Sequence, residues 1–312
     1  MFVVDLADPP AEPGAVPPGV VVAVGEQDSD TADWWRNYAT LTLSESEGGD
    51  RRTVVVDSVP EALDELDRRC RQWPQASAVC DDVLRSVDTS GPALAGIVTE
   101  SLAYSTLQSG PEFARWLSER GPAQPPESGE PVLAHRDDGA LTLRLNRPNR
   151  HNALSNDMRA ALLDYLMVAQ LDPSVTDVVL AGNGASFCSG GDLSEFGTFV
   201  DPASAHLART RHSPALALDE ITCRLGARCR AEIHGHVLGS GLELAAFCGR
   251  VVCSADATLG LPELALGLIP GAGGTFSVTR RIGRWRTAYL VLSGRTLDAV
   301  TALSWGLVDE LC

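Results

Sequence analysis

The sequence predicts an α/β protein built around a mostly parallel sheet, and three observations support this fold class. Leu141, Leu143 and Leu145 alternate with other residues, as they would in a half-buried strand. Residues 178–181 form a short continuous apolar run, which is typical of a strand buried on both faces. A second such run, at 231–235, leads into a glycine-rich turn and a helix-like segment. Strands that alternate with helices along a chain indicate parallel pairing.

The bulk composition limits the partners and the chemistry. The chain has 312 residues, 44% of them apolar, which is enough for one large domain or two of ordinary size. The formal net charge of −16 argues against nucleic acid or an anionic membrane surface as the main partner. All 25 basic residues are arginine, so a Schiff-base lysine and a phosphate-loop lysine are both excluded.

Cysteine spacing and the first residues bear on the compartment. None of the eight cysteines is spaced as in a zinc ribbon or a redox dithiol. His234 and His236 have no third ligand at metal spacing. Residues 1–5 lack the parts of a signal peptide, and no apolar stretch of about 18 residues could span a membrane. We therefore expect a cytoplasmic protein without a metal site.

Shifts in composition divide the chain into four regions. The expected boundaries are 1–57 for an N-terminal arm with short strands, 58–120 for a helical region, 121–130 for a Pro/Gly linker and 131–312 for the core. Strands in the arm are expected at 20–24, 41–43 and 53–56, and a helix in the core at about 156–170.

Local signals mark the helices of the region 58–120. Ser58 and Glu61 form a capping-box pattern in front of an amphipathic segment. Pro74 ends this helix or starts the next one, because proline cannot occupy a helix interior without breaking it. Further helices are expected at about 75–87, at 92–107 and around 113–117.

Two glycine-rich turns carry possible chemistry. The first covers 187–193, just after a buried strand, and the second covers 235–245, where a strand passes into a helix. The second turn places free N–H groups at a helix N-terminus, where negative charge is favoured. Two such N–H groups that converge on one point would form an oxyanion hole. The alternative is two tight turns with no further role.

Two glutamates are candidates for acid/base work. Glu243 lies among apolar residues, where a charge is costly unless it is used or paired. Glu263 follows Pro262 in a loop before another apolar run. Two carboxylates near one oxyanion hole suit proton transfer at a carbon next to a carbonyl. Taken alone, each glutamate is better explained as a surface or helix-pairing carboxylate.

Together these segments resemble the crotonase (enoyl-CoA hydratase/isomerase) superfamily over residues 131–312. The matching motifs are Phe-Cys-Ser-Gly-Gly-Asp-Leu at 187–193, Leu-Gly-Ser-Gly-Leu-Glu-Leu-Ala at 238–245 and Leu-Pro-Glu-Leu-Ala-Leu-Gly-Leu-Ile-Pro-Gly-Ala-Gly-Gly-Thr at 261–275. Residues 147–154 are similar to the family's first CoA-binding turn, and 293–308 to its closing segment. The resemblance implies a crotonase-like spiral of ββα units.

The resemblance also implies roles for individual residues. The N–H groups of Gly191 and Ser240 would hold the thioester oxygen, Glu243 would activate water and Glu263 would transfer the proton at the α-carbon. Gly271 would help to place the water. The candidates for CoA binding are Arg147, Arg150, His151 and Ala153. The implied partner is an acyl-CoA thioester, with no metal or redox cofactor, and a homo-oligomer (trimer or hexamer) is expected.

The sequence departs from the family pattern in three places. Ser240 stands where the family usually has glycine, and the loop from 192 to 231 is longer and richer in Arg and His. The family normally continues beyond the segment that ends at Cys312 into helices that cover the active site. Parts of the region 54–120 resemble those helices, so we expect a circular permutation, with an unrelated helical domain as the alternative.

These features favour an enoyl-CoA hydratase or isomerase that stabilises a thioester enolate. Within the same fold, the alternatives are an acyl-CoA hydrolase, a C–C lyase and a cofactor-free oxygenase. A non-catalytic partner subunit is the alternative from another class. The presence of both glutamates favours the enzyme. The acyl chain is not determined by the sequence.

Overall fold

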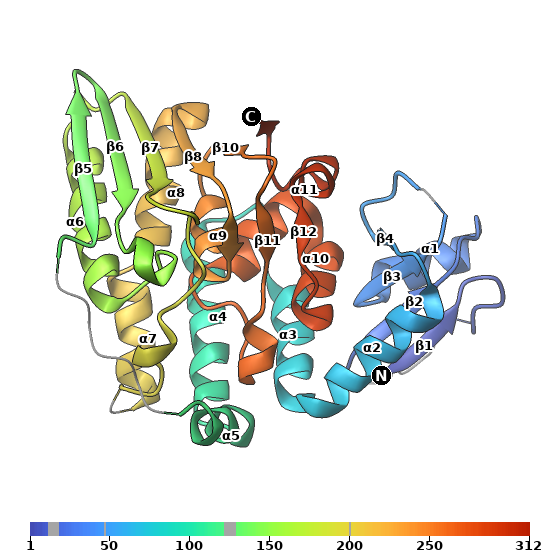
Figure 1. Cartoon of the computed structure of the whole chain (residues 1–312). Helices are drawn as coiled ribbons and strands as arrows, with labels where there is room; N and C mark the ends of the chain where they lie inside the picture. Colours follow the sequence, from blue (N-terminus) through green and yellow to red (C-terminus); the bar gives the residue numbers. More distant parts are fainter. Residues whose placement is uncertain (12–18, 47, 122–128, 200) are drawn as a thin grey trace.

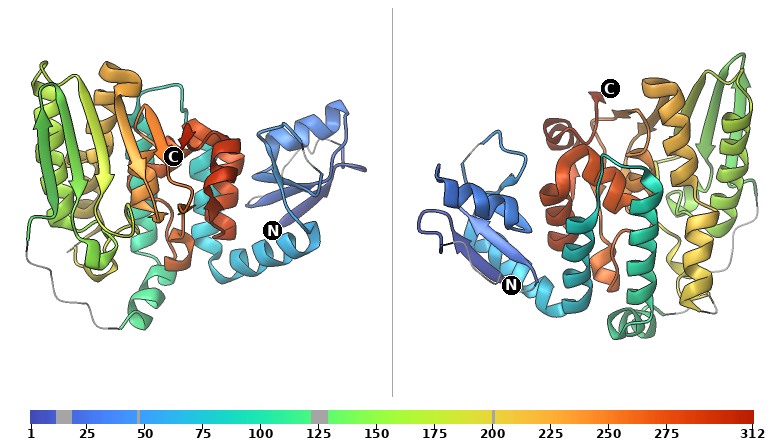
Figure 2. Two further views of the ribbon diagram at one scale, coloured as in Figure 1. Left: turned by 45° about the horizontal axis from the view of Figure 1, so that its top comes forward. Right: turned by 180° about the vertical axis from the view of Figure 1, so that it is seen from behind.

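The computed structural model describes residues 1–11, 19–46, 48–121, 129–199 and 201–312. The molecule has two separate groups of strands with helices between them (Figures 1 and 2). A six-stranded sheet lies at one end and a four-stranded N-terminal sheet at the other. Helices α3, α4 and α10 lie between the two sheets.

The six-stranded sheet confirms the predicted α/β class. Its strand order is β13-β10-β8-β7-β6-β5, and every neighbouring pair is parallel except β5 with β6. The central strand β7 is buried over five of its six residues, as its continuous apolar run indicated. The strands are β5 (Val132–Asp137), β6 (Ala140–Leu145), β7 (Asp177–Gly182), β8 (Cys229–Ile233), β10 (Arg250–Cys253) and β13 (Glu310–Leu311).

A smaller sheet and several helices complete this part of the chain. The small sheet has the order β12-β11-β9, with β9 (His236–Leu238), β11 (Thr258–Gly260) and β12 (Leu297–Asp298). The helices are α6 (Asn156–Leu171), α7 (Pro202–Arg211), α8 (Pro214–Leu225), α9 (Ser240–Ala245), α10 (Gly274–Ser293) and α11 (Ala299–Trp305). Short 3-10 turns are η1 (Pro148–Arg150), η2 (Leu193–Glu195), η3 (Gly226–Arg228) and η4 (Glu263–Leu266).

The region 58–120 is helical where the sequence signals predict it. Its helices are α2 (Val59–Gln72), α3 (Pro74–Ser86), α4 (Ala93–Gln108) and α5 (Pro111–Glu119). Ser58 caps α2 by accepting the N–H of Glu61, and Pro74 is the first residue of α3. No helix within the described residues is long and apolar enough to cross a membrane.

These helices pack directly on the core. Helix α10 contacts α2, α3 and α4, while α4 contacts α7 and α5 contacts η4. Residues from both regions belong to one continuous cluster of buried apolar side chains. Arg69 of α2 also donates to the carbonyl of Leu292 in α10 at 2.7 Å. The helical region therefore covers the side of the core that α10 forms.

The N-terminal segment is more ordered than the arm that the sequence analysis describes. Its sheet is parallel in the order β1-β2-β3-β4, with β1 (Phe2–Asp5), β2 (Val21–Val24), β3 (Leu41–Ser44) and β4 (Thr53–Val55). The sequence analysis predicted the last three strands and missed β1 and helix α1 (Asp30–Tyr38). Trp35 of α1 is 1% exposed, so it is a packing residue. Residues 12–18 of the predicted N-terminal arm lie outside the described part of the chain.

Candidate active site

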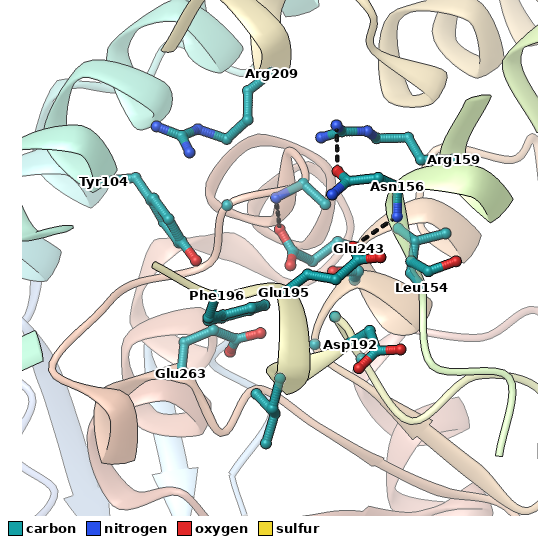
Figure 3. A pocket seen from close by; sticks show the side chains of 18 of the residues that line it. Tyr104, Leu154, Asn156, Arg159, Asp192, Glu195, Phe196, Arg209, Glu243 and Glu263 are labelled. Atoms are coloured by element: carbon teal, nitrogen blue, oxygen red, sulfur yellow. Dashed lines mark hydrogen bonds between the residues drawn. The ribbon is translucent and has the colours of Figure 1, made fainter. Parts of the chain in front are cut away.

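A cavity of about 310 Å³ lies where both glycine-rich turns meet the N-terminal end of α10 (Figure 3). Five residues singled out from the sequence line it: Gly191, Ser240, Glu243, Glu263 and Gly271. The walls also include Tyr104 of α4 and Phe196. The structure thus brings the predicted oxyanion turns and both candidate carboxylates to one cavity.

The N–H groups of Gly191 and Ser240 have the setting of an oxyanion hole. Within the described residues, neither N–H donates to another group of the protein. The two turns lie close together, since a Cβ added to Gly191 would be 3.8 Å from Ser240 Oγ. Gly190 and Gly239 adopt φ angles of 104° and 47°, which other residues rarely adopt. The two N–H groups therefore lie on neighbouring turns without an acceptor among the described residues, as the predicted oxyanion hole requires.

Glu243 is held firmly at the base of the cavity. It lies in the first turn of α9 and is 1% exposed. Its Oε2 accepts the N–H groups of Ala272 and Gly274, both at 2.7 Å. Burial raises the pKa of Glu243 to about 7, although these donors oppose the rise. A carboxyl group with such a pKa can exchange a proton near neutral pH.

Glu263 lies beside the second glycine-rich turn, the one that also carries Glu243. It is the first residue of η4, and its carboxyl group lies so close to Gly239 that any Cβ there would clash with Oε1. Its Oε2 is buried and has no hydrogen-bond partner among the described residues. Burial, followed by the charge of Glu243, raises the pKa of Glu263 well above its usual value. A buried carboxyl oxygen without a partner is costly and is typical of a functional site.

The sequence analysis missed two residues that α4 contributes to this region. The ring of Tyr104 lies against Gly271, where it leaves no room for a Cβ, and burial raises the pKa of its hydroxyl. Glu100 is 1% exposed and accepts the N–H groups of Gly273 and Thr275. The signal that drew attention to Glu243 also existed for Glu100, a lone carboxylate in the largely apolar segment 93–107.

Two arginines also line the cavity and were not predicted. Arg209 of α7 lies 4.5 Å from the centre of the Tyr104 ring and donates to the hydroxyl of Ser101. Arg159 of α6 donates to the side chain of Asn156 at 2.7 Å. Neither arginine forms an ion pair with a carboxylate of the described chain. Both come from segments outside the recognised motifs, where sequence alone gives no direction for a side chain.

The predicted CoA-binding turn at 147–154 borders the cavity, and of its residues only Leu154 belongs to the lining. The Arg147 side chain is 8% exposed and pairs with Asp192 at 2.8 Å. It also donates to the carbonyl of Ala153. These contacts hold its guanidinium within the protein, and CoA binding by Arg147 remains a prediction.

The other candidates of this turn are more accessible. Arg150 is partly exposed, and His151 is exposed with a φ of 49°. The Nδ1 of His151 lies 3.0 Å from Ser186 Oγ. Asn152 fixes the turn from beneath, because its side chain donates to the carbonyls of Asn183 and Ser186. CoA binding by Arg150, His151 and Ala153 remains a prediction.

The parallel sheet, the two unpartnered N–H groups and the two buried carboxyl groups together define an enzyme of the crotonase fold. Comparison with known proteins agrees: the enoyl-CoA hydratase/isomerase family matches residues 135–312. The 2,3-dehydroadipyl-CoA hydratase of Escherichia coli is 36% identical over 187 residues, which cover 58% of this chain and 68% of that protein. The mevalonyl-coenzyme A hydratase of Beauveria bassiana is 31% identical over 60% of this chain and 69% of its own length.

Solved structures give the same result. A putative enoyl-CoA hydratase of Thermobifida fusca in complex with CoA superimposes with a TM-score of 0.51 at 28% identity, over 59% of this chain and 72% of that one. A putative enoyl-CoA hydratase/isomerase of Mycobacterium abscessus has a TM-score of 0.52 at 33% identity, over 58% and 70% of the two chains. The chain therefore belongs to the enoyl-CoA hydratase/isomerase family of enzymes. The family match begins at residue 135, so α2 to α5 lie outside it.

Proposed function

We propose that this enzyme adds water to a 2-enoyl-CoA thioester at the cavity between the two glycine-rich turns. One observation carries the proposal: two buried carboxyl groups, Glu243 and Glu263, line the same cavity as the free N–H groups of Gly191 and Ser240. Both carboxyl groups have raised pKa values. The cavity can therefore hold one carboxylate and one carboxylic acid at once, as an acid/base pair requires.

The reaction follows from this arrangement. The Glu243 carboxylate takes one proton from a water molecule as the water oxygen bonds to C3 of the enoyl group. The electron pair of the C2=C3 bond moves toward the thioester, and the oxygen that becomes negative accepts the N–H groups of Gly191 and Ser240. The Glu263 carboxylic acid then donates its proton to C2, which gives the 3-hydroxyacyl-CoA. Gly271, whose backbone lies beside Glu243, would help to place the water.

The test is a turnover assay on purified protein with short, medium and aromatic 2-enoyl-CoA thioesters. Loss of the conjugated double bond, followed by absorbance and confirmed by mass spectrometry of the hydrated product, supports the proposal. An absence of hydration with all three classes contradicts it and favours the other enolate reactions of this fold.

We further propose that α2 to α5 take the place of the helices that close the active site in related enzymes. Support comes from their packing on α10 and from the position of Tyr104 in the cavity wall. A circular permutation would relate the two arrangements. A homo-oligomer, a cytoplasmic location and the independence from a metal or redox cofactor remain predictions from the sequence.

A further inference from the structure

Two carboxylates share the backbone N–H groups of one four-residue segment. This segment runs from Ala272 to Thr275, where α10 begins. Glu243 accepts the N–H groups of residues 272 and 274, each at 2.7 Å. Glu100 accepts those of residues 273 and 275, at 2.7 and 2.8 Å, and also the hydroxyl of Thr275 at 2.8 Å. The four donors are thus taken alternately by the two side chains.

The segment depends on Glu100 because its N–H groups are buried. The first N–H groups of a helix have no partner within the helix, and a buried donor without an acceptor costs about 1–3 kcal/mol. Gly273 and Thr275 are buried, so Glu100 satisfies two donors that water does not reach. If these two donors shift, the N–H groups of residues 272 and 274, which alternate with them, must shift as well.

We propose that Glu100 is a positioning residue for the reaction, which holds the segment 272–275 in place and so fixes the carboxylate of Glu243 toward the substrate. This inference rests on the hydration chemistry proposed above. It gives the helical region a role beyond covering the core, because Glu100 is the part of α4 that reaches the catalytic segment.

The charge of Glu100 offers a second way to test its role, through the pKa values of neighbouring carboxyl groups. Burial, followed by the charge of Glu243, raises the pKa of Glu100 to about 8, and Glu100 in turn contributes to the raised pKa of Glu263. Tyr104 on its own helix and Arg209 on α7 are the other titratable or charged groups that interact with Glu100. Because the charge of Glu100 contributes to the raised pKa of Glu263, a neutral residue at position 100 should lower the pKa of Glu263.

The experiment compares Glu100→Gln with Glu100→Asp in the full chain. The Gln variant is neutral and cannot accept at both donors, so we expect kcat to fall about tenfold to a hundredfold, as for a small misplacement of a catalytic group. KM should change less than about threefold. The basic limb of the pH–rate profile, which the acid Glu263 sets, should move to lower pH. The Asp variant keeps the charge but is shorter, so kcat should fall while the limbs stay in place.

Glu112 provides a matched control. It is also a buried glutamate, 6% exposed, and accepts the backbone N–H groups of Gln75 and Ala76, but it does not line the cavity. Glu112→Gln should lower the melting temperature without moving the pH profile. The proposal is overturned if Glu100→Gln keeps the wild-type kcat and profile, or if it behaves like Glu112→Gln in both.

Two further measurements distinguish the absence of a positioning role from misfolding of the variant and from failure of the proposed hydration activity. If Glu100→Gln does not fold, the Asp variant decides, and an unchanged kcat in a folded Asp variant overturns the proposal. If the wild type hydrates no enoyl-CoA, the proposed function fails, and hydrogen exchange then tests the positioning by itself. The amides of residues 273 and 275 should exchange faster in a folded Glu100 variant than in Glu112→Gln, and equal protection contradicts the inference.

Discussion

Arg147 and Asp192 form a buried ion pair at 2.8 Å, and each side chain is 8% exposed. Arg147 lies just after β6 at the start of the predicted CoA-binding turn, and Asp192 directly follows Gly191. The pair therefore ties that turn to the first glycine-rich turn, at 187–193. A second link is the hydrogen bond from the N–H of Leu154 to the carbonyl of Gly190 at 2.8 Å.

Arg147→Ala should act on stability more than on CoA binding. Removing the guanidinium leaves the buried Asp192 carboxylate without its partner, which costs about 3–5 kcal/mol for a buried pair. Urea unfolding measures this loss. Arg150→Ala should change the free energy of unfolding by less than about 1 kcal/mol and raise KM instead. The opposite pattern would favour Arg147 over Arg150 among the predicted CoA-binding residues.

Glu243→Gln and Glu263→Gln should each reduce hydration by about two to four orders of magnitude, the usual effect of losing a general acid or base. Affinity for free CoA, measured by calorimetry, should stay within about threefold of the wild type, because neither residue lies in the CoA-binding turn. A variant of either glutamate that keeps more than about a tenth of the wild-type kcat would remove that residue from the mechanism.

Substitution of Ser240 separates its backbone from its side chain. Ser240→Ala keeps the N–H group and should retain most of the activity. Ser240→Pro has no N–H to donate and should abolish hydration. The variant should still fold, because proline is tolerated at the first position of a helix such as α9. Circular dichroism and melting curves check that both variants fold. Equal losses in two folded variants would assign a direct role to the hydroxyl group.

Stability should depend on pH through the buried carboxyl groups. The folded-state pKa of Glu263 lies above the unfolded value of 4.5. The folded state therefore keeps a proton that the unfolded chain loses, and this contribution to stability is lost as pH rises above the unfolded pKa toward the folded one. Glu263→Gln lacks this term. Relative to wild type, its free energy of unfolding should increase as pH rises above 4.5.

Urea unfolding of both proteins at each pH measures this difference. The other carboxylates of the chain titrate equally in the two proteins, so their contributions cancel in the comparison. Parallel stability curves would show that Glu263 titrates normally in the folded protein.

A fragment of residues 131–312 should aggregate, because it exposes the apolar surface of α10 that α2, α3 and α4 cover. Coexpression with a second fragment of residues 1–121 should restore a soluble complex. Size-exclusion chromatography of the two preparations measures this. A fragment 131–312 that is monomeric and unfolds cooperatively would show that the helical region is a separate domain and not part of the core.

Much of the fold followed from local physical chemistry. Ser58 and Pro74 marked the ends of helices because a cap and a missing N–H act within one turn of the chain. Residues 178–181 marked a central strand because burial on both faces requires a continuous apolar run. β1 was missed because three of its four positions are exposed, so it gives no periodic pattern. α1 was missed although Ser29 caps it by accepting the N–H of Ala32.

By itself, the sequence determined the family and singled out the two glycine-rich turns and the candidate pair Glu243 and Glu263, because each motif is a contiguous stretch whose order and spacing are characteristic. Tertiary structure alone decided what joins them. How distant segments pack decides whether Arg147 faces solvent or pairs with Asp192. It also decides whether Glu100 accepts the N–H of Gly273, which lies 173 residues further along the chain. Local patterns encode which face of a helix is buried, but they do not encode which distant donor lies opposite a buried carboxylate.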